Sequence, residues 1–411
     1  METLALILAG GKGSRLDLLS LKRSKPAVPF AGKFRIIDFS LSNASNSGIM
    51  NIAILTQYLP FSLNEHIGSG KAWDLDRRDS QVTILHPHDK WYMGTADAVN
   101  KNINFVKRKK PKYVLILSGD HIYKMDYRKL IAQHEKLGAE MTIATKVVPF
   151  EDVSRFGILE TNEEGYVLDF IEKPQSSTSN LASMGIYLFN YDCLIDALKE
   201  TESKNENLDF GKHVIPYLIY DKKAKIGTYK YYDYWQDVGT YDSYLSTSLE
   251  LNNQVIELDL YDPTWRIYTA LDGFPPAKFG VDAKVSKSLI SDGTVIEGSV
   301  INSVLSPGVY VRKGAVVKDS VILNDCIIGE NVQLDRVIAD KNVIIGRNTI
   351  IGHGNDFTPN DEKPDLLSSG ITVIEKRAVI DSDIKIGRNC RIQRSAKFED
   401  KQVVKSGLTI K

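Results

Sequence analysis

Three glycines and two basic side chains follow the first apolar run of the sequence, residues 4–9. Glycine lets the backbone turn tightly and bring its N–H groups close to an anion, and Arg and Lys neutralise the charge of that anion. The order G-G-x-G-x-R-L matches neither the P-loop nor the dinucleotide fingerprint, and a glycine turn alone favours a purely structural loop. The added cations favour a phosphate-binding turn. Its residues are Gly10, Gly11, Gly13, Arg15 and Lys25.

Two carboxylates stand in turns far apart in the sequence. Asp120 follows the apolar run 113–117 in "LSGDHIY", and Asp237 lies in "YWQDVGT". A single carboxylate at a strand end is often only a helix cap. Two that converge would bind Mg²⁺, which bridges phosphate oxygens and offsets their charge during phosphoryl transfer.

Two further short motifs contain charged or aromatic side chains that suit a sugar phosphate or a nucleotide. "FIEKP" holds Glu172 and Lys173, which fit either a sugar phosphate or a solvated ion pair. Trp91 and Tyr92 precede the turn of "MGTADAV", where aromatic rings suit stacking or ribose contacts. Core packing is the commoner use of Trp, so both interpretations stay open here.

Short apolar runs alternate with longer amphipathic segments over the first 250 residues, which predicts an α/β domain with a mainly parallel sheet. Ligands of such sheets bind at the carboxyl ends of the strands, where "AGGKGSR", "TQY" and "SGDH" stand. The expected strands are 4–9, 51–56, 113–118, 141–147 and 184–189, and the expected helices include 96–108 and 126–137.

A period of six replaces this pattern from about residue 285, and the words "IIGEN", "IIGRN" and "KIGRN" repeat. Branched aliphatic residues at this period predict a hexapeptide left-handed β-helix. Residues 353–370 break the period and are expected to form a loop. We therefore expect a catalytic domain at 1–250, a linker at 251–284 and the β-helix at 285–411. The periodic rows are Tyr310, Val316, Ile322, Ile328, Leu334; Ile338, Ile344, Ile350; and Ile380, Ile386, Ile392.

Composition narrows the classes of partner. The 52 basic and 52 acidic side chains cancel, which gives no electrostatic argument for a nucleic-acid partner. The first apolar run is too short to span a bilayer and no basic region precedes it, so we expect no membrane partner. Cys193, Cys326 and Cys390 match no metal spacing and indicate reduced thiols. A cytoplasmic protein is the default expectation.

Together these words resemble the bacterial glucose-1-phosphate adenylyltransferases, also called ADP-glucose pyrophosphorylases. "LAGGKGSRL" is typical of sugar nucleotidyltransferases in general, whereas "GKFRIIDFSLSN" and "ASMGIY" indicate the ADP-glucose branch. The resemblance runs over essentially the whole chain. It implies a GT-A-like nucleotidyltransferase domain followed by a left-handed β-helix, a homotetramer, and synthesis of ADP-glucose and pyrophosphate from ATP and glucose 1-phosphate for glycogen formation.

The resemblance also implies residue roles. Arg15 and Lys25 would act with the ATP phosphates, and Asp120 and Asp237 would bind Mg²⁺. The implied nucleotide-binding residues are Gly10, Gly11, Gly13, Gln57 and Trp91. The implied glucose 1-phosphate pocket comprises Tyr92, Gly157, Glu172, Lys173 and Ser183.

Regulation by a glycolytic intermediate or an adenine nucleotide is a further implication, through Lys22, Arg23 and Arg35. Simple surface charge explains these three cations equally well, and Pro29 stands where enteric relatives carry histidine. Three rival interpretations remain: a non-catalytic regulatory subunit, a pyrophosphorylase for another nucleotide or sugar, and a bifunctional enzyme with an acyl-transferring β-helix. The presence of the expected functional residues argues against the first; they are Arg15, Lys25, Asp120, Lys173 and Asp237.

Overall fold

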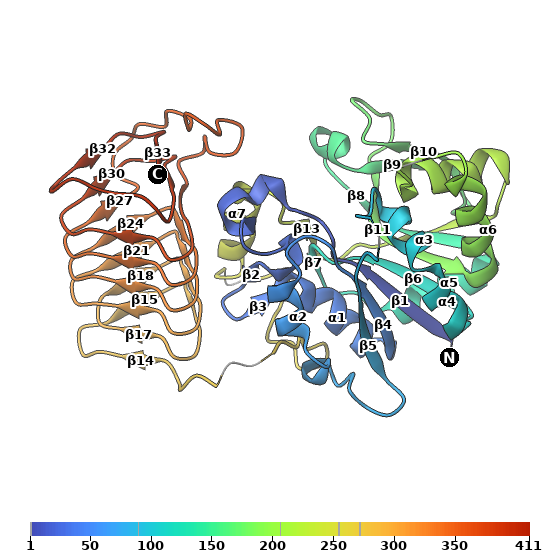
Figure 1. The fold of residues 1–411 in the computed structure, drawn as a ribbon, viewed down its shortest axis with the longest axis horizontal. Helices are drawn as coiled ribbons and strands as arrows, with labels where there is room; N and C mark the ends of the chain where they lie inside the picture. Colours follow the sequence, from blue (N-terminus) through green and yellow to red (C-terminus); the bar gives the residue numbers. More distant parts are fainter. Residues whose placement is uncertain (1, 89, 206, 254, 271–272) are drawn as a thin grey trace. The chain divides into compact units, whose positions relative to one another are not determined.

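The computed structural model describes all residues except 1, 89, 206, 254 and 271–272 (Figure 1). The chain divides into two compact units. The first comprises residues 1–11, 37–235 and 262–268, and the second comprises residues 12–36, 236–261 and 269–411. The N-terminal segment 12–36 therefore belongs to the same unit as the β-helix. Within the described residues, no helix has the length and apolar character needed to cross a membrane.

The first unit contains a nine-stranded sheet, and the strands in one half of this sheet run parallel to one another. These parallel strands are apolar and largely buried, as expected for a sheet with both faces covered. Gly10, Gln57 and Asp120 follow the carboxyl ends of three of them. In spatial order they are β6 (Tyr113–Ser118), β1 (Thr3–Leu8), β4 (Asn51–Leu55) and β5 (Gln81–Leu85).

The other half of the sheet is arranged around β11 (Leu181–Asn190), which runs antiparallel to β6, β8 and β9. The sheet is thus mixed, and a bulge between Ser183 and Tyr187 interrupts the pairing of β11 with β8. The remaining strands are β8 (Met141–Val147), β9 (Gly157–Thr161), β10 (Val167–Glu172) and β12 (Ile226–Lys230).

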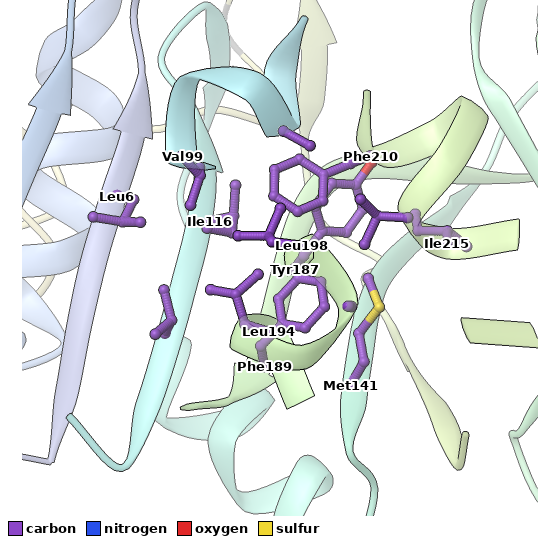
Figure 2. Packing of buried hydrophobic residues seen from close by; sticks show 14 of the residues in the cluster. Leu6, Val99, Ile116, Met141, Tyr187, Phe189, Leu194, Leu198, Phe210 and Ile215 are labelled. Atoms are coloured by element: carbon purple, nitrogen blue, oxygen red, sulfur yellow. The ribbon is translucent and has the colours of Figure 1, made fainter. Parts of the chain in front are cut away.

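Helices supply the apolar surface that covers the sheet, and Figure 2 shows Leu194 and Leu198 of one helix among Tyr187, Phe189 and Phe210. The segment expected as one helix over 96–108 is two helices. They are separated at Asn102, whose side-chain amide donates to the carbonyl of Ala98 and to the Tyr92 hydroxyl. The helices are α1 (Ile36–Asn46), α2 (Phe61–Ile67), α3 (Thr95–Lys101), α4 (Ile103–Lys109), α5 (Tyr127–Leu137), α6 (Tyr191–Glu202) and α7 (Tyr241–Glu250).

The second unit contains three parallel sheets of short strands stacked coil on coil, which form the left-handed β-helix (Figure 1). The first sheet is β14 (Lys278–Phe279), β17 (Val295–Ile296), β20 (Tyr310–Val311), β23 (Ile327–Ile328), β26 (Ile344–Ile345) and β29 (Val379–Ile380). The second is β15 (Lys284–Ser286), β18 (Ser299–Ile301), β21 (Val316–Lys318), β24 (Gln333–Asp335), β27 (Ile350–Ile351), β30 (Lys385–Ile386) and β32 (Val403–Val404). The third is β16 (Leu289–Ile290), β19 (Val304–Leu305), β22 (Val321–Ile322), β25 (Val337–Ala339), β28 (Thr372–Ile374), β31 (Arg391–Ile392) and β33 (Thr409–Ile410).

The repeated words mark the corners of these coils. Asn331, Asn348 and Asn389 each take a positive φ of 56–59°, a conformation that Asn tolerates better than most residues. The Asn331 amide donates to Asn348, and the Asn348 amide donates to Asp383, so corner side chains form a ladder along the stack. The predicted apolar rows were one residue out of phase in two places. Val311 and Val317 are buried, whereas Tyr310 and Val316 are partly exposed. Ile345 and Ile351 are buried, whereas Ile344 is exposed and Ile350 is partly exposed, so the inward-facing residue lies one position later at these four points.

The segment 353–370 is irregular, as expected from its break in the period. The buried Asn360 donates to the carbonyls of Asn389 and Gly407, and Arg388 donates to the carbonyl of Gly354. Shorter elements of the chain are η1 (Ser14–Ser20), η2 (Lys25–Ala27), β2 (Pro29–Phe30), β3 (Phe34–Arg35), η3 (Lys71–Trp73), β7 (His121–Tyr123), η4 (Phe150–Arg155), the π-helical η5 (Phe210–Val214) and η6 (Tyr217–Asp221), and β13 (Trp235–Asp237). In the expected linker, residues 254 and 271–272 lie outside the described residues.

Candidate active site

The glycine-rich turn begins directly at the end of β1, where the amide of Ala9 donates to the carbonyl of Leu55. Gly13 has a φ of +66°, and a Cβ on it would lie 2.8 Å from the Cβ of Lys25. A side chain at position 13 is therefore excluded by both backbone conformation and space. The absence of a Cβ lets the Lys25 side chain lie against the turn.

Lys25, Arg15 and Asp237 meet in the second unit. Lys25 Nζ lies 2.6 Å from Asp237 Oδ1, and Arg15 Nη2 lies 3.4 Å from Asp237 Oδ2. Lys25 and Asp237 are buried, whereas the Arg15 side chain is about half exposed. Gly239 leaves room for this arrangement, because a Cβ there would be 2.7 Å from Arg15 Nη2. Two cations predicted to bind phosphate thus share one carboxylate predicted to bind metal.

Asp120 lies in the first unit, just after β6. The Ser118 hydroxyl donates to Asp120 Oδ1, and His121 Nε2 lies 3.6 Å from the same oxygen. The His121 ring packs edge-on against Trp235, with 5.2 Å between the ring centroids. Asp120 is partly exposed, so a hydrated cation can reach it. Carboxylate oxygens are the ligands Mg²⁺ prefers, and the residue types at positions 120 and 237 fit that ion.

Gln57 and the turn 91–94 are held together by two hydrogen bonds. The Gln57 side chain donates to the carbonyl of Tyr92 and accepts from the amide of Tyr92. The Tyr92 ring is buried in the core, its hydroxyl accepts from Asn102, and burial raises the pKa of that hydroxyl. Trp91 is 57% exposed, so this turn presents the Trp91 indole rather than the Tyr92 phenol to solvent.

Glu172 lies at the end of β10, opposite Gly157 of β9. A Cβ on Gly157 would lie 2.9 Å from Glu172 Oε2, and one on Gly211 would lie 2.5 Å from the same atom. Two backbones therefore approach this carboxylate closely. Burial raises the pKa of Glu172; Lys173 opposes the shift and Asp209 adds to it. Lys173 Nζ lies 3.6 Å from Glu172 Oε1, and its side chain is mostly exposed.

Ser183 lies at the bulge of β11, where its hydroxyl is 3.4 Å from the hydroxyl of the buried Tyr187. Gly185 takes a positive φ of 68°, and its amide donates to Ser183 Oγ. The strand β11 pairs with β9, which in turn pairs with β10, the strand that carries Glu172. Ser183, Gly157, Glu172 and Lys173 therefore belong to one region of the first unit.

Sequence reasoning gave no role to Asp209, which is close enough to raise the pKa of Glu172. Asp209 caps η5 by accepting from the amides of Gly211 and Lys212, and it accepts from the Thr95 hydroxyl. The signal available in the sequence was the word "LDFGKH", in which Asp precedes a helical start and a glycine. Sequence reasoning also gave no role to Tyr187, because an aromatic residue in an apolar strand indicates a core position.

The fold and these two clusters define a nucleotide-transferring enzyme with a β-helical second domain. A family model described as nucleotidyl transferase matches residues 4–254, and one described as GlmU-like, C-terminal hexapeptide, matches residues 275–374. The chain is 49% identical to a glucose-1-phosphate adenylyltransferase of Thermomicrobium roseum, over 100% of this chain and 97% of the relative. It is 47% identical to the glucose-1-phosphate adenylyltransferase of Thermotoga neapolitana, over 97% of this chain and 96% of the relative. It is 45% identical to that of Acetivibrio thermocellus, over 94% of this chain and 92% of the relative. The chain belongs to the glucose-1-phosphate adenylyltransferase family.

Proposed function

We propose that this enzyme transfers the adenylyl group of ATP to α-D-glucose 1-phosphate, giving ADP-glucose and pyrophosphate for glycogen synthesis in the cytoplasm. The observation that carries the proposal is the pairing of Lys25 and Arg15 with Asp237 beside the glycine turn. It supplies, in one place, two cations for a triphosphate and one carboxylate for its metal. The family relationship supports the choice of nucleotide and sugar.

The nucleophile in this reaction is a phosphate oxygen of glucose 1-phosphate. It is largely ionised at neutral pH because the second pKa of a phosphate monoester is about 6. The reaction therefore needs no general base, which agrees with a sequence that offers no Ser–His–Asp or Cys–His arrangement. What it needs is alignment of the nucleophile with the α-phosphorus and neutralisation of charge on the departing pyrophosphate.

In this proposal Gly10, Gly11 and Gly13 present backbone amides to the triphosphate, and Arg15 and Lys25 neutralise the leaving pyrophosphate. Gln57 holds the turn whose exposed Trp91 contacts the nucleotide. Asp120 and Asp237 bind Mg²⁺, and His121 directly follows Asp120 in the chain. When bound, Mg²⁺ would supply positive charge that stabilises the negative charge developing on the phosphate oxygens.

Glucose 1-phosphate binds, in the same proposal, at the region of Gly157, Glu172, Lys173 and Ser183. Lys173 carries an exposed ammonium suited to the sugar phosphate, and Glu172 accepts from sugar hydroxyls. Tyr92 contributes its backbone at the edge of the pocket, since its ring is in the core.

Lys22, Arg23 and Arg35 are proposed to attract an anionic effector. In the second unit, burial and then the charges of Arg35 and Arg23 lower the pKa of Lys341. Burial and then the charge of Arg23 lower the pKa of Lys376. Such a concentration of cations favours an anion. Arg23 also binds Asp340, so we assign direct contact with the effector first to Lys22 and Arg35. A homotetramer, alone or with a regulatory subunit, is the assembly that we propose.

The proposed function is tested by pyrophosphate release from the purified chain with glucose 1-phosphate, Mg²⁺ and each of ATP, UTP and dTTP. We expect release with ATP well above the other two. Release with UTP or dTTP instead would assign the chain to another branch of sugar nucleotidyltransferases. Absence of release with all three would favour a regulatory subunit.

A further inference from the structure

Asp17 takes a backbone conformation that L residues rarely adopt. Its φ of 33° and ψ of −103° interrupt η1, the 3₁₀ segment Ser14–Ser20, two residues after Arg15. Such conformations are unfavourable and persist only where the surroundings hold them. The turn that presents Arg15 is therefore not at its own conformational minimum, and other parts of the protein must maintain it.

The side chain of Asp17 is bound by Arg391, a residue of β31 in the β-helix. Arg391 Nε donates to Asp17 Oδ2 at 2.5 Å, and Nη2 donates to Oδ1 at 3.1 Å. Both side chains are about nine-tenths buried. A two-point contact between a planar guanidinium and a carboxylate fixes direction as well as distance. This pair therefore determines the orientation of Asp17 in a way that a single contact could not.

Two further hydrogen bonds act on the peptide group that joins Asp17 to Leu18. The amide of Leu18 donates to the Tyr241 hydroxyl at 2.9 Å, and the Ser20 hydroxyl is 3.1 Å from the carbonyl of Asp17. The unusual rotation at Asp17 directs its carbonyl and the next amide to these partners. Both polar groups of this peptide therefore have partners, and the Asp17 side chain is bound to the β-helix.

A second ion pair has the same relation to Lys25. Arg23, two residues before Lys25, donates from Nη2 to both carboxylate oxygens of Asp340 at 2.9 Å. Both side chains are almost completely buried, at 3% and 1% exposure. Each cation assigned to the triphosphate therefore lies two residues from an ion pair with the β-helix.

We propose that Arg391 is a positioning residue for the ATP phosphates, because by binding Asp17 it holds the strained turn that orients Arg15. The ion pair of Arg23 with Asp340 has the corresponding role for Lys25. The inference rests on the proposed function of Arg15 and Lys25. It gives the β-helix a part in every turnover, in addition to any effector binding. The β-helix does not need this pair to fold, because it has an extensive apolar core of its own.

The test uses Arg391→Gln and Arg391→Lys in the full-length enzyme, with Arg388→Gln as the matched control. Arg388 also lies in the last coils and donates to a carboxylate, Asp335, at 2.7 Å, but that partner is within the β-helix. We expect Arg391→Gln to lower kcat/KM for ATP about 10- to 100-fold while KM for glucose 1-phosphate stays within twofold. Arg391→Lys keeps the positive charge but cannot make the two-point contact, so its kcat/KM for ATP should lie between those of the wild type and Arg391→Gln. Arg388→Gln should keep wild-type ATP kinetics.

Arg391 also lies 3.8 Å from Glu362, so Asp17→Asn is the second variant. It removes the charge that Arg391 binds, leaves Glu362 in place, and keeps a residue type that tolerates positive φ. It should reproduce the ATP-specific loss of Arg391→Gln. Wild-type ATP kinetics in both variants would overturn the inference, as would equal losses for both substrates accompanied by a matching fall in thermal stability. An inactive wild-type enzyme would instead overturn the proposed function.

Discussion

Lys25 Nζ lies 2.6 Å from Asp237 Oδ1, so a cation assigned to the triphosphate and a carboxylate assigned to its metal form one buried ion pair. Arg15 reaches the other oxygen of the same carboxylate. Removing one partner of a buried pair leaves the other charge without compensation, which is costly. In the proposed function, Arg15 and Lys25 would pair with the triphosphate and Asp237 would hold Mg²⁺, so neither charge would be left without a partner when the substrate binds.

Lys25→Gln tests that exchange. We expect kcat/KM for ATP to fall about 100-fold or more, the usual effect of removing one donor to developing charge, with a smaller change in KM for glucose 1-phosphate. Steady-state pyrophosphate release measures both constants. Lys33→Gln is the control, since Lys33 is an exposed cation in the adjacent hairpin. Equal behaviour of the two variants would remove Lys25 from the phosphate site.

Gly13→Ala tests the shape of the turn. The positive φ of 66° and the 2.8 Å approach to Lys25 Cβ both oppose a side chain, so we expect about 1–3 kcal/mol of destabilisation and weaker ATP binding. Chemical denaturation and the KM for ATP give the two quantities. Gly273→Ala is the matched change, because among the described residues nothing lies within 4 Å of a Cβ at that position. Identical stability of the two variants would refute the steric argument.

Lys173→Ala tests the sugar-phosphate site. Lys173 is an exposed cation beside Glu172, so its loss should raise KM for glucose 1-phosphate about 10-fold or more and leave KM for ATP nearly unchanged. Lys230→Ala removes a similarly exposed cation at the end of β12 and should change neither constant. An unaltered KM for glucose 1-phosphate in Lys173→Ala would count against its assignment.

The lowered pKa of the buried Lys341 makes the free energy of unfolding depend on pH. Burial first, then the charges of Arg35 and Arg23, lower its pKa from 10.5 to about 8. Below about pH 8 both the folded and the unfolded chain hold the proton, so the folded state bears the full cost of the buried charge. Between about pH 8 and 10.5 only the unfolded chain holds it, and the stability of the folded state rises with pH.

We therefore expect Lys341→Met to be more stable than the wild type at pH 7, by an amount on the order of 1–3 kcal/mol. This advantage should shrink as the pH rises from about 8 to 10. Urea denaturation of both proteins across that range measures it. A constant difference between the two proteins would show that the pKa of Lys341 is not lowered.

The sequence was sufficient for features that depend on local spacing. The period of six predicted the β-helix because each coil must place an apolar side chain inward at the same point, and the words with Asn mark corners that require positive φ. The strands β1, β4 and β6 were predictable from their apolar runs. Strand direction was not, because the antiparallel pairing of β11 depends on partners distant in the chain.

Long-range ion pairs were also beyond sequence reasoning. Arg23 and Asp340 are separated by 317 residues, and Asp17 and Arg391 by 374, and nothing in the spacing of charged residues selects one partner over another. Tyr92 illustrates the reverse case. Its type suggested a ligand contact, but the break at Asn102 places its hydroxyl in a core hydrogen bond.

The most direct test of the account is ADP-glucose formation from ATP, glucose 1-phosphate and Mg²⁺, measured by chromatography for the wild type and Asp120→Ala together. We predict that the wild type forms ADP-glucose and that the variant loses two or more orders of magnitude in turnover, with its circular dichroism and thermal midpoint preserved. A wild type that forms no ADP-glucose, or an Asp120→Ala variant with near-normal turnover, would contradict it.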